Sequence, residues 1–204
     1  SVTDTTGALG GLAEVDVFAF QPVTPGGPTT VVVGGVEEPE SLYLYSDSRL
    51  AASTVLDAIY DGPIESLGYG YQAVLVERLP KLGDADGDAT LETVSVAAGE
   101  EYVDADTGQV LTAEEAVDDL PRLTVRFRIR EGVTWQDGTP VTADDSVWSA
   151  ELACDPETST DKALCERTAR YEKVDDRTVE WQGLPGYADP TYYTNFYSPL
   201  PRHQ

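Results

Sequence analysis

A strand, a tight corner and a capped helix follow one another between residues 123 and 153, and this order constrains the fold more than any other part of the chain. The strand is indicated by alternation, because apolar and polar side chains take turns from Leu123 to Arg130. That two-residue period is typical of a strand with one buried face. The apolar face consists of Leu123, Val125, Phe127 and Ile129. We expect this face to lie against the core.

Turn and capping residues follow the strand. Asp137-Gly138 supplies a glycine that tolerates positive φ at the point where the chain reverses. Thr142 stands at a helix N-cap, and Asp145 three residues later completes a variant of the capping box with Asp in place of Glu. The sequence therefore predicts a sharp corner, anchored by a buried Trp135, that joins the strand to a helix.

Other patterns predict a mixture of helices and strands, which indicates an α/β fold with a mixed sheet. Strands are predicted at 29–34, 72–79 and 90–97, a hairpin at 101–109 and a strand–turn–strand unit at 172–181. Helices are predicted at 49–60, 112–119, 163–171 and 190–196.

The charge balance excludes some partners. Thirteen Lys and Arg residues stand against 37 Asp and Glu residues, which gives a formal net charge of −24. Such a chain repels phosphate backbones and anionic lipid headgroups, so we expect no nucleic-acid partner. No run of about 18 apolar residues is present, so no membrane-spanning helix is expected either.

A short acidic run is the only candidate for a metal site. Asp84, Asp86 and Asp88 alternate as the oxygen ligands of calcium loops do. However, Ala89 occupies the position where an EF-hand requires Gly, and Ser95 stands where the closing Glu belongs. A solvated polar turn is therefore the preferred interpretation, with calcium binding as a weak alternative.

Catalytic motifs are not found. His203 is the only histidine and lies in a Pro-flanked segment, so neither a Ser-His-Asp nor a Cys-His arrangement is expected. The stretch LGYGY at 67–71 has two glycines but lacks the Lys or third glycine of a phosphate-binding loop. We therefore expect no enzymatic activity and no cofactor.

The strand–corner–helix segment resembles the family 5 extracellular solute-binding proteins, the oligopeptide, dipeptide and nickel receptors of bacterial ABC importers. Members carry the run R-x-G-V-x-W-x-D-G-x-P-x-T-A-x-D after a hydrophobic strand. Ten residues match at fixed spacing: Arg130, Gly132, Val133, Trp135, Asp137, Gly138, Pro140, Thr142, Ala143 and Asp145. Weaker similarities are EPESL at 38–42, which is similar to the exit of the first strand, and PLPRH at 199–203, which is similar to a P-L-P-K-H segment. The resemblance covers residues 29–204.

The resemblance implies part of a periplasmic-binding-protein type II fold. It implies a flexible leader at 1–28, a first-lobe strand and helix at 29–60, and an extra subdomain of the first lobe at 61–204. The stretch at about 81–121 is interpreted as an insertion in that subdomain. On this view the chain lacks the second lobe that closes on the ligand. The resemblance also implies an extracellular location, with membrane association only through a lipid anchor outside this chain.

An exported protein with two cysteines favours a disulfide between them. Cys154 and Cys165 are separated by eleven positions, and a bridge of this loop length stabilises a protein by about 3 kcal/mol. Two free thiols remain the alternative. Zinc is not expected, because two Cys and one distant His make a poor ligand set.

The resemblance also indicates a ligand-binding segment. In the peptide receptors, the residues just after S-L run along the cleft, which points here to Tyr45, Ser46, Asp47 and Ser48. Asp47 is positioned to meet the positive end of a ligand. A plain N-cap loop before the helix at 49–60 is the alternative interpretation.

The predicted function is therefore capture of extracellular peptides and delivery to an ABC permease. Nickel or its chelates and oligosaccharides remain possible cargoes. Two other classes stay open, namely a calcium-binding or structural extracellular module and a glycoside hydrolase fragment.

Overall fold

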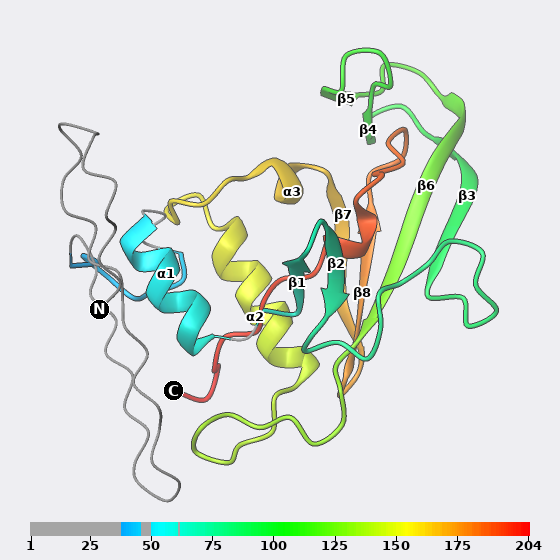
Figure 1. The fold of residues 1–204 in the computed structure, drawn as a ribbon. Coiled ribbons are helices and arrows are strands. Elements are labelled where there is room, and N and C mark those ends of the chain that lie inside the picture. The colour runs from blue at the N-terminus through cyan, green and yellow to red at the C-terminus, as the bar shows by residue number, and fades with distance from the viewer. Residues whose placement is uncertain (1–37, 46–49, 61) are drawn as a thin grey trace, which may run out of the picture. The chain divides into compact units, whose positions relative to one another are not determined.

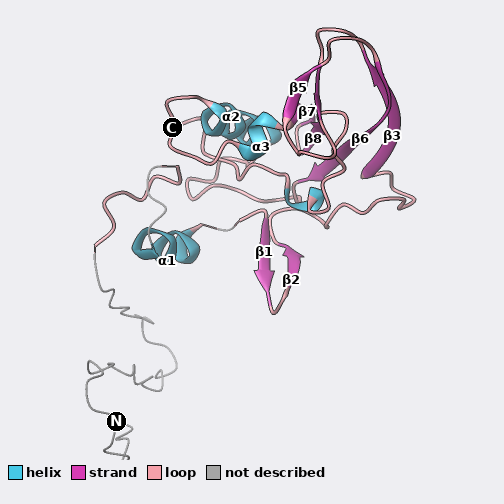
Figure 2. Cartoon of the chain, turned by 90° about the horizontal axis from the view of Figure 1, so that it is seen from above, coloured by secondary structure: helices cyan, strands magenta, loops and turns pink. Residues whose placement is uncertain are grey.

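The computed structural model describes residues 38–45, 50–60 and 62–204, and its main feature is a four-stranded antiparallel sheet with helices on one side (Figures 1 and 2). The helices are α1 (Leu50–Ile59), α2 (Ala143–Cys154) and α3 (Ala163–Glu166), and η1 (Tyr192–Thr194) is a 3-10 turn. The strands are β1 (Ile64–Leu67), β2 (Gly70–Ala73), β3 (Ala89–Val96), β4 (Glu101–Val103), β5 (Val110–Thr112), β6 (Val117–Arg128), β7 (Thr168–Asp175) and β8 (Thr178–Gly183). The predicted mixture of helices and strands is confirmed.

The main sheet has the strand order β3-β6-β8-β7, with antiparallel pairs throughout. The long strand β6 pairs with β3 on one side and with β8 on the other, so that Val125 faces both Ala89 and Trp181. Two hairpins, β1–β2 and β4–β5, form separate two-stranded sheets. Helix α2 packs against β7 and β8, and Figure 2 shows α2 and α3 together on one side of the sheet.

The buried face of β6 is the one that the alternation predicts. Leu123 is 1% exposed, and Val125, Phe127 and Ile129 are completely buried. Val179 and Trp181 on β8 extend the same face, and Phe196 packs edge-on against Phe127 with the ring centroids 5.3 Å apart. Each such side chain contributes about 1.5–3 kcal/mol when it is fully buried. This cluster is the core that holds the sheet to the helices.

The predicted corner is present after β6. The Trp135 N–H donates to the Thr139 carbonyl at 2.7 Å, and the Gly138 N–H donates back to the Trp135 carbonyl at 2.9 Å. Gly138 has φ +89°, a value that L-residues with a side chain rarely adopt. The Trp135 ring packs on the core cluster but is half-buried, not fully buried as predicted, because its outer side lines a groove.

The capping box at the start of α2 is also confirmed. The Thr142 N–H donates to Asp145 Oδ2 at 2.8 Å, and the Asp145 N–H points back to the side chain of Thr142. Asp145 is 6% exposed, so this carboxylate lies inside the protein and not on the helix surface. The helix therefore begins at a residue that is packed and hydrogen-bonded.

Several predicted elements agree with the structure. Helix α1 lies within the predicted 49–60, and β3 overlaps the predicted 90–97. The pair β4–β5 forms the predicted hairpin, and β7–β8 forms the strand–turn–strand unit. The segment 81–121 supplies β3 and the start of β6 to the main sheet, and its status as an insertion relative to the family stays a prediction. The predicted leader at 1–28 and the predicted strand at 29–34 lie outside the described residues.

The strand predicted at 72–79 is wrong beyond Ala73. The Pro63 carbonyl accepts N–H groups from three successive residues, Val74, Leu75 and Val76, at 3.1, 3.2 and 3.4 Å. Three consecutive donors that converge on one oxygen require a bend, so β2 cannot continue. Val76 then forms an isolated bridge with Ile129 instead.

The helix predicted at 112–119 is wrong because its residues pair with distant strands. Thr112 ends β5 opposite Glu101, and Val117 begins β6 opposite Val96. Asp119 has φ +61°, which no helix accommodates. Tertiary pairing therefore overrides the helical pattern.

Two other predicted helices are shorter than expected. The helix predicted at 163–171 ends at Glu166, because residues from Thr168 onwards pair with β8. The helix predicted at 190–196 is reduced to the 3-10 turn η1. Within the described part of the chain, no helix has the length and apolar character needed to cross a bilayer.

Candidate functional site

Only one of the four predicted ligand-binding residues lies in the described part of the chain. Tyr45 is half-buried, whereas Ser46, Asp47 and Ser48 lie outside the described residues. The side chain of Tyr45 packs on a small cluster formed by Ala150, Ala153 and Tyr197. This cluster lies on α2 and the segment after η1, so the structure joins the stretch before α1 to a helix about 100 residues later.

A relay of two hydrogen bonds holds Tyr45 to α2. The Tyr45 hydroxyl lies 2.6 Å from Ser149 Oγ, and Ser149 Oγ donates to the Ser198 carbonyl at 2.5 Å. A serine hydroxyl has a single proton, and here it points to the Ser198 carbonyl. Ser149 Oγ is therefore the acceptor for Tyr45, and the phenolic proton of Tyr45 is used inside the protein.

A second relay of the same kind lies one turn earlier on α2. Ser146 Oγ donates to the Tyr197 carbonyl at 2.6 Å and lies 2.7 Å from the Tyr171 hydroxyl. By the same count of protons, Tyr171 donates to Ser146. The Tyr171 oxygen in turn accepts the Tyr197 N–H at 3.1 Å. Both serines are completely buried, so the two relays fasten residues 197 and 198 to α2.

Burial raises the pKa values of the three phenols of this region. Removal from solvent raises the pKa of Tyr45 above its ordinary value and raises the pKa of Tyr171 far above it. Burial also raises the pKa of Tyr197 to about 12. The rings of Tyr171 and Tyr197 pack edge to face with their centroids 5.0 Å apart. All three groups remain hydrogen-bond partners, not charges, at neutral pH.

The predicted disulfide is present beside the relays. Cys154 at the end of α2 is bonded to Cys165 in α3, with their Cα atoms 5.6 Å apart. The Tyr197 hydroxyl lies 3.4 Å from one sulfur and 3.3 Å from the other. The bridge therefore ties the far end of α2 to the segment that leads into β7.

The structure brings two motifs together that are far apart in the sequence. His203 Nε2 lies 2.7 Å from Asp137 Oδ2 at the corner, and the Arg202 N–H donates to Asp145 Oδ1 at 3.2 Å. A backbone N–H from Thr139, followed by the contact with His203, holds the pKa of Asp137 well below its usual value. The PLPRH segment thus closes on the corner, and His203 has a structural partner.

A groove of about 620 Å³ lies between the end of α1, the corner and the final segment. Its walls are largely apolar, with Ile59, Val74, Leu75, Val133, Trp135, Val141, Pro199 and Pro201 among the lining residues. Arg130 is the basic residue at its edge, and the Arg130 guanidinium donates to the carbonyls of Val76 and Ala73, both at 3.0 Å. Pockets of this size and character commonly hold small ligands or apolar side chains.

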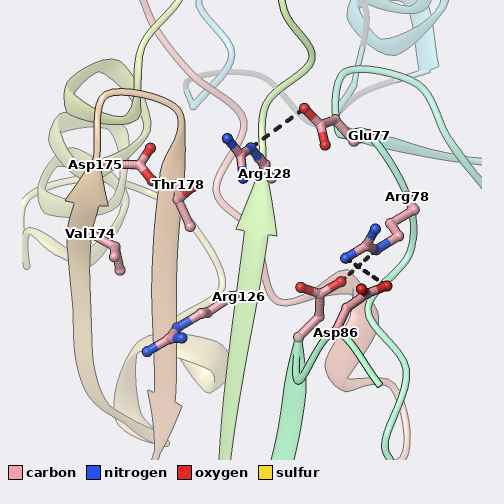
Figure 3. Close-up of a pocket in the computed structure, with 9 residues that line it drawn as sticks. Glu77, Arg78, Asp86, Arg126, Arg128, Val174, Asp175 and Thr178 are labelled. Atoms are coloured by element: carbon pink, nitrogen blue, oxygen red, sulfur yellow. Dashed lines mark hydrogen bonds and ion pairs between the residues drawn. The ribbon is translucent and has the colours of Figure 1, made fainter. Parts of the chain in front are cut away.

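A second cavity, of about 460 Å³, lies on the opposite, charged face of the sheet (Figure 3). Arg78, Arg126 and Arg128 line it together with the carboxylates Glu77, Asp86, Asp88 and Asp175. These charges already pair with one another or with their neighbours. Arg126 contacts Glu180 at 2.8 Å, and Arg128 lies 3.5 Å from Glu77. Little binding capacity remains for a ligand.

The calcium candidates take part in the same network. Asp88 and Asp86 lie 2.6 and 3.1 Å from the Arg78 guanidinium, so both carboxylates pair with a side chain of this protein. Asp84 is exposed and accepts the Gly87 N–H through its carbonyl. In the ranges that the structure describes, no group of three His, Cys, Asp or Glu residues could hold a metal ion.

Sequence reasoning missed the serine–tyrosine relays. Ser146 and Ser149 are three residues apart in α2, which places them on one helix face. Together with Ala150 and Ala153 they form a buried stripe of small residues. That spacing was the available signal, but the tyrosine partners at 45 and 171 are too distant in sequence to be inferred.

Comparison with known proteins identifies the strand–corner–helix unit. Residues 109–203 match the family model of the bacterial extracellular solute-binding proteins, family 5 Middle. The periplasmic oligopeptide-binding protein OppA of Salmonella typhimurium is 31% identical over 80 residues, which are 37% of this chain and 15% of that protein.

Solved structures share the fold. The oligopeptide-binding protein of Thermus thermophilus, complexed with a pentapeptide, superposes with a TM-score of 0.52 at 17% identity, over 76% of this chain and 22% of its own. AppA of Bacillus subtilis, in complex with a nonapeptide, superposes with a TM-score of 0.54 at 18% identity, over 83% of this chain and 27% of its own. The substrate-binding protein CtaP of Listeria monocytogenes superposes with a TM-score of 0.52 at 20% identity, over 81% of this chain and 27% of its own.

The chain therefore spans between 15% and 27% of the lengths of these relatives. The part that it covers contains the ten-residue match, the corner that this match forms and the PLPRH segment that closes on it. These findings together support kinship of residues 109–203 with the bacterial extracellular solute-binding proteins of family 5.

Proposed function

We propose that this chain is part of the first lobe of a receptor that captures extracellular peptides and delivers them to the permease of an ABC importer. The observation that carries the proposal is the family match over residues 109–203, which includes the corner, α2 and the disulfide. The similarity to proteins named oligopeptide-binding favours peptide as the cargo. The receptor binds its cargo without chemical change.

The ligand contacts proposed in this chain are Tyr45, Ser46, Asp47 and Ser48. Asp47 supplies a negative charge for the N-terminal ammonium or a basic side chain of a peptide. Polar contacts to the peptide backbone tolerate many side chains, because every peptide presents the same N–H and C=O groups. The receptor acts at the outer face of the cell membrane, where a lipid anchor holds it.

Peptide retention by the whole receptor tests this function. The receptor that contains this chain is incubated with a random pentapeptide library, separated from free peptide by gel filtration and analysed by mass spectrometry. We expect intact pentapeptides to be retained. Recovery of cleaved peptides would favour an enzyme. Retention of no peptide at any library concentration up to 1 mM, ~1000 times a dissociation constant of about 1 μM, would refute the proposal.

A charge-matched pair of variants tests the role of Asp47. Asp47→Asn should weaken retention by at least about tenfold, because a hydrogen bond between charged groups is worth about 1.5–3 kcal/mol. Asp57→Asn removes the same charge from an exposed position on α1 and should leave retention unchanged. Equal effects of the two substitutions would remove Asp47 from the site.

A further inference from the structure

We propose that Ser149 is a positioning residue for ligand binding, which acts by holding Tyr45 in place. This inference rests on the proposed function, because Tyr45 opens the segment assigned to the ligand. Ser149 lies 104 residues away from Tyr45 in sequence, is completely buried and does not belong to that segment. Its effect on a ligand must therefore pass through the 2.6 Å bond to the Tyr45 hydroxyl.

The direction of the hydrogen bonds determines what Tyr45 offers to a ligand. Ser149 uses its only proton on the Ser198 carbonyl, so the Tyr45 hydroxyl donates to Ser149. The phenol then has no proton left to donate, and its remaining polar capacity is the acceptor lone pair. Tyr45 is thereby set to accept a hydrogen bond, which suits a peptide N–H or ammonium and not a carbonyl or carboxylate.

Helix α2, which carries Ser149, is held in place at both ends. Asp145 caps the start of α2 with a bond of 2.8 Å to the Thr142 N–H, and the Cys154–Cys165 bridge holds the end of the helix. The middle of the helix is packed through Ala150 and Ala153 against the Tyr45 ring and Tyr197. A supporting residue on a rigid helix restricts the orientation of the side chain it holds, and this lowers the entropy lost on binding.

The Ser146 relay provides a matched control on the same helix. Ser146 is equally buried, donates to the neighbouring carbonyl of Tyr197 and accepts from a tyrosine, Tyr171. Loss of either serine hydroxyl therefore removes the same number and kind of hydrogen bonds. The difference is that the hydrogen bond to the Tyr45 hydroxyl is made by Ser149, whereas Ser146 is bonded to Tyr171. A purely structural effect would be the same for both serines, whereas a positioning effect belongs to Ser149 alone.

The experiment compares Ser149→Ala, Tyr45→Phe, the double variant and Ser146→Ala in the whole receptor. For each, we measure the concentration of the random pentapeptide library that gives half-maximal retention, together with the thermal unfolding midpoint. Ser149→Ala should raise that concentration about fivefold, the effect of one lost net hydrogen bond of about 1 kcal/mol. Ser146→Ala should lower the unfolding midpoint about as much as Ser149→Ala does, but it should leave retention unchanged.

The double variant separates positioning from a general loss of stability. Because Ser149 acts through the Tyr45 hydroxyl, Ser149→Ala should have no further effect on retention once Tyr45 is Phe. Three results would each overturn the inference. The first is that the effects of Ser149→Ala and Tyr45→Phe on retention add up, and the second is that Ser149→Ala retains peptide as well as the wild type. The third is that Ser149→Ala and Ser146→Ala lose the same amount of retention. A wild-type receptor that retains no peptide would refute the proposed function itself. Should Ser149→Ala fail to fold, Tyr45→Phe against Tyr171→Phe provides the same comparison from the tyrosine side.

Discussion

Asp145 connects the corner, the start of α2 and the final segment, so its removal gives the most informative test of the fold. Its Oδ2 atom accepts the Thr142 N–H at 2.8 Å and lies 3.1 Å from the Thr142 hydroxyl, and its Oδ1 atom accepts the Arg202 N–H at 3.2 Å. The Trp135 indole nitrogen lies 3.5 Å from the same carboxylate. Asp145 is 6% exposed, so water cannot readily replace these bonds.

The magnitude follows from the two backbone donors that lose their acceptor. Both N–H groups are part-buried, and an N–H that is shielded from water and left unsatisfied costs about 1–3 kcal/mol, so Asp145→Ala should lower the free energy of unfolding by about 3 kcal/mol. Asp145→Asn keeps one carbonyl acceptor and should have about half that effect, roughly 1.5 kcal/mol. Urea unfolding followed by tryptophan fluorescence measures both values, since Trp135 is next to the site.

The neighbouring Asp144 is the control for this experiment. It lies in the same helical turn and pairs with Lys173 at 2.7 Å, but its side chain is 48% exposed. A solvent-exposed ion pair contributes at most about 1 kcal/mol, so Asp144→Ala should be the milder change. If both alanine variants lose the same free energy of unfolding, Asp145 does not connect the three segments and the reasoning fails.

Three other predictions concern the disulfide, acid stability and a close backbone contact. Replacing both Cys154 and Cys165 by Ser should lower the free energy of unfolding by about 3 kcal/mol, and reducing agent should then destabilise the wild type but not the variant. The depressed pKa of Asp137 stabilises the fold fully above about pH 3.9, the pKa of an Asp in the unfolded chain, and progressively less at lower pH. Asp137→Asn should therefore flatten the acid limb of a curve of unfolding free energy against pH. An acid limb that is the same in the variant and the wild type would contradict this. Gly186→Ala would place a Cβ 2.0 Å from a β4 carbonyl oxygen, so it should lower the free energy of unfolding in urea by more than ~3 kcal/mol. Gly87 also has a positive φ but faces open space, so Gly87→Ala should lower the same free energy by about 1 kcal/mol. Equal losses of unfolding free energy in the two variants would show that the contact at Gly186 relaxes freely.

Local patterns predicted the parts of the fold whose partners are close in sequence. The alternation from Leu123 to Ile129 gave the buried face of β6, because a two-residue period leaves only two ways to orient a strand. The capping box of Thr142 and Asp145 and the turn at Gly138 are similarly local, since each involves residues within a few positions of one another. The two cysteines are eleven positions apart, which favoured a bridge, and the structure shows that bridge in place of the free thiols that were the alternative.

Patterns failed where a distant segment competed for the same backbone. Residues 112–119 have a helical pattern, but pairing with β3 and β4 satisfies their backbone groups instead. The strand expected to continue past Ala73 bends because the Pro63 carbonyl collects three N–H groups. Neither partner is visible in a window of ten residues, so a local reading selects the wrong element.

The sequence by itself indicated the resemblance to family 5 and the strand–corner–helix unit, because these depend on residue types at short, fixed spacings. The tertiary structure alone decided that Tyr45 donates inward to Ser149 and that His203 closes on Asp137. Such contacts join residues 104 and 66 positions apart. Hydrogen bonds require their partners to approach within about 3 Å, and only the packed sheet and helix bring these groups that close.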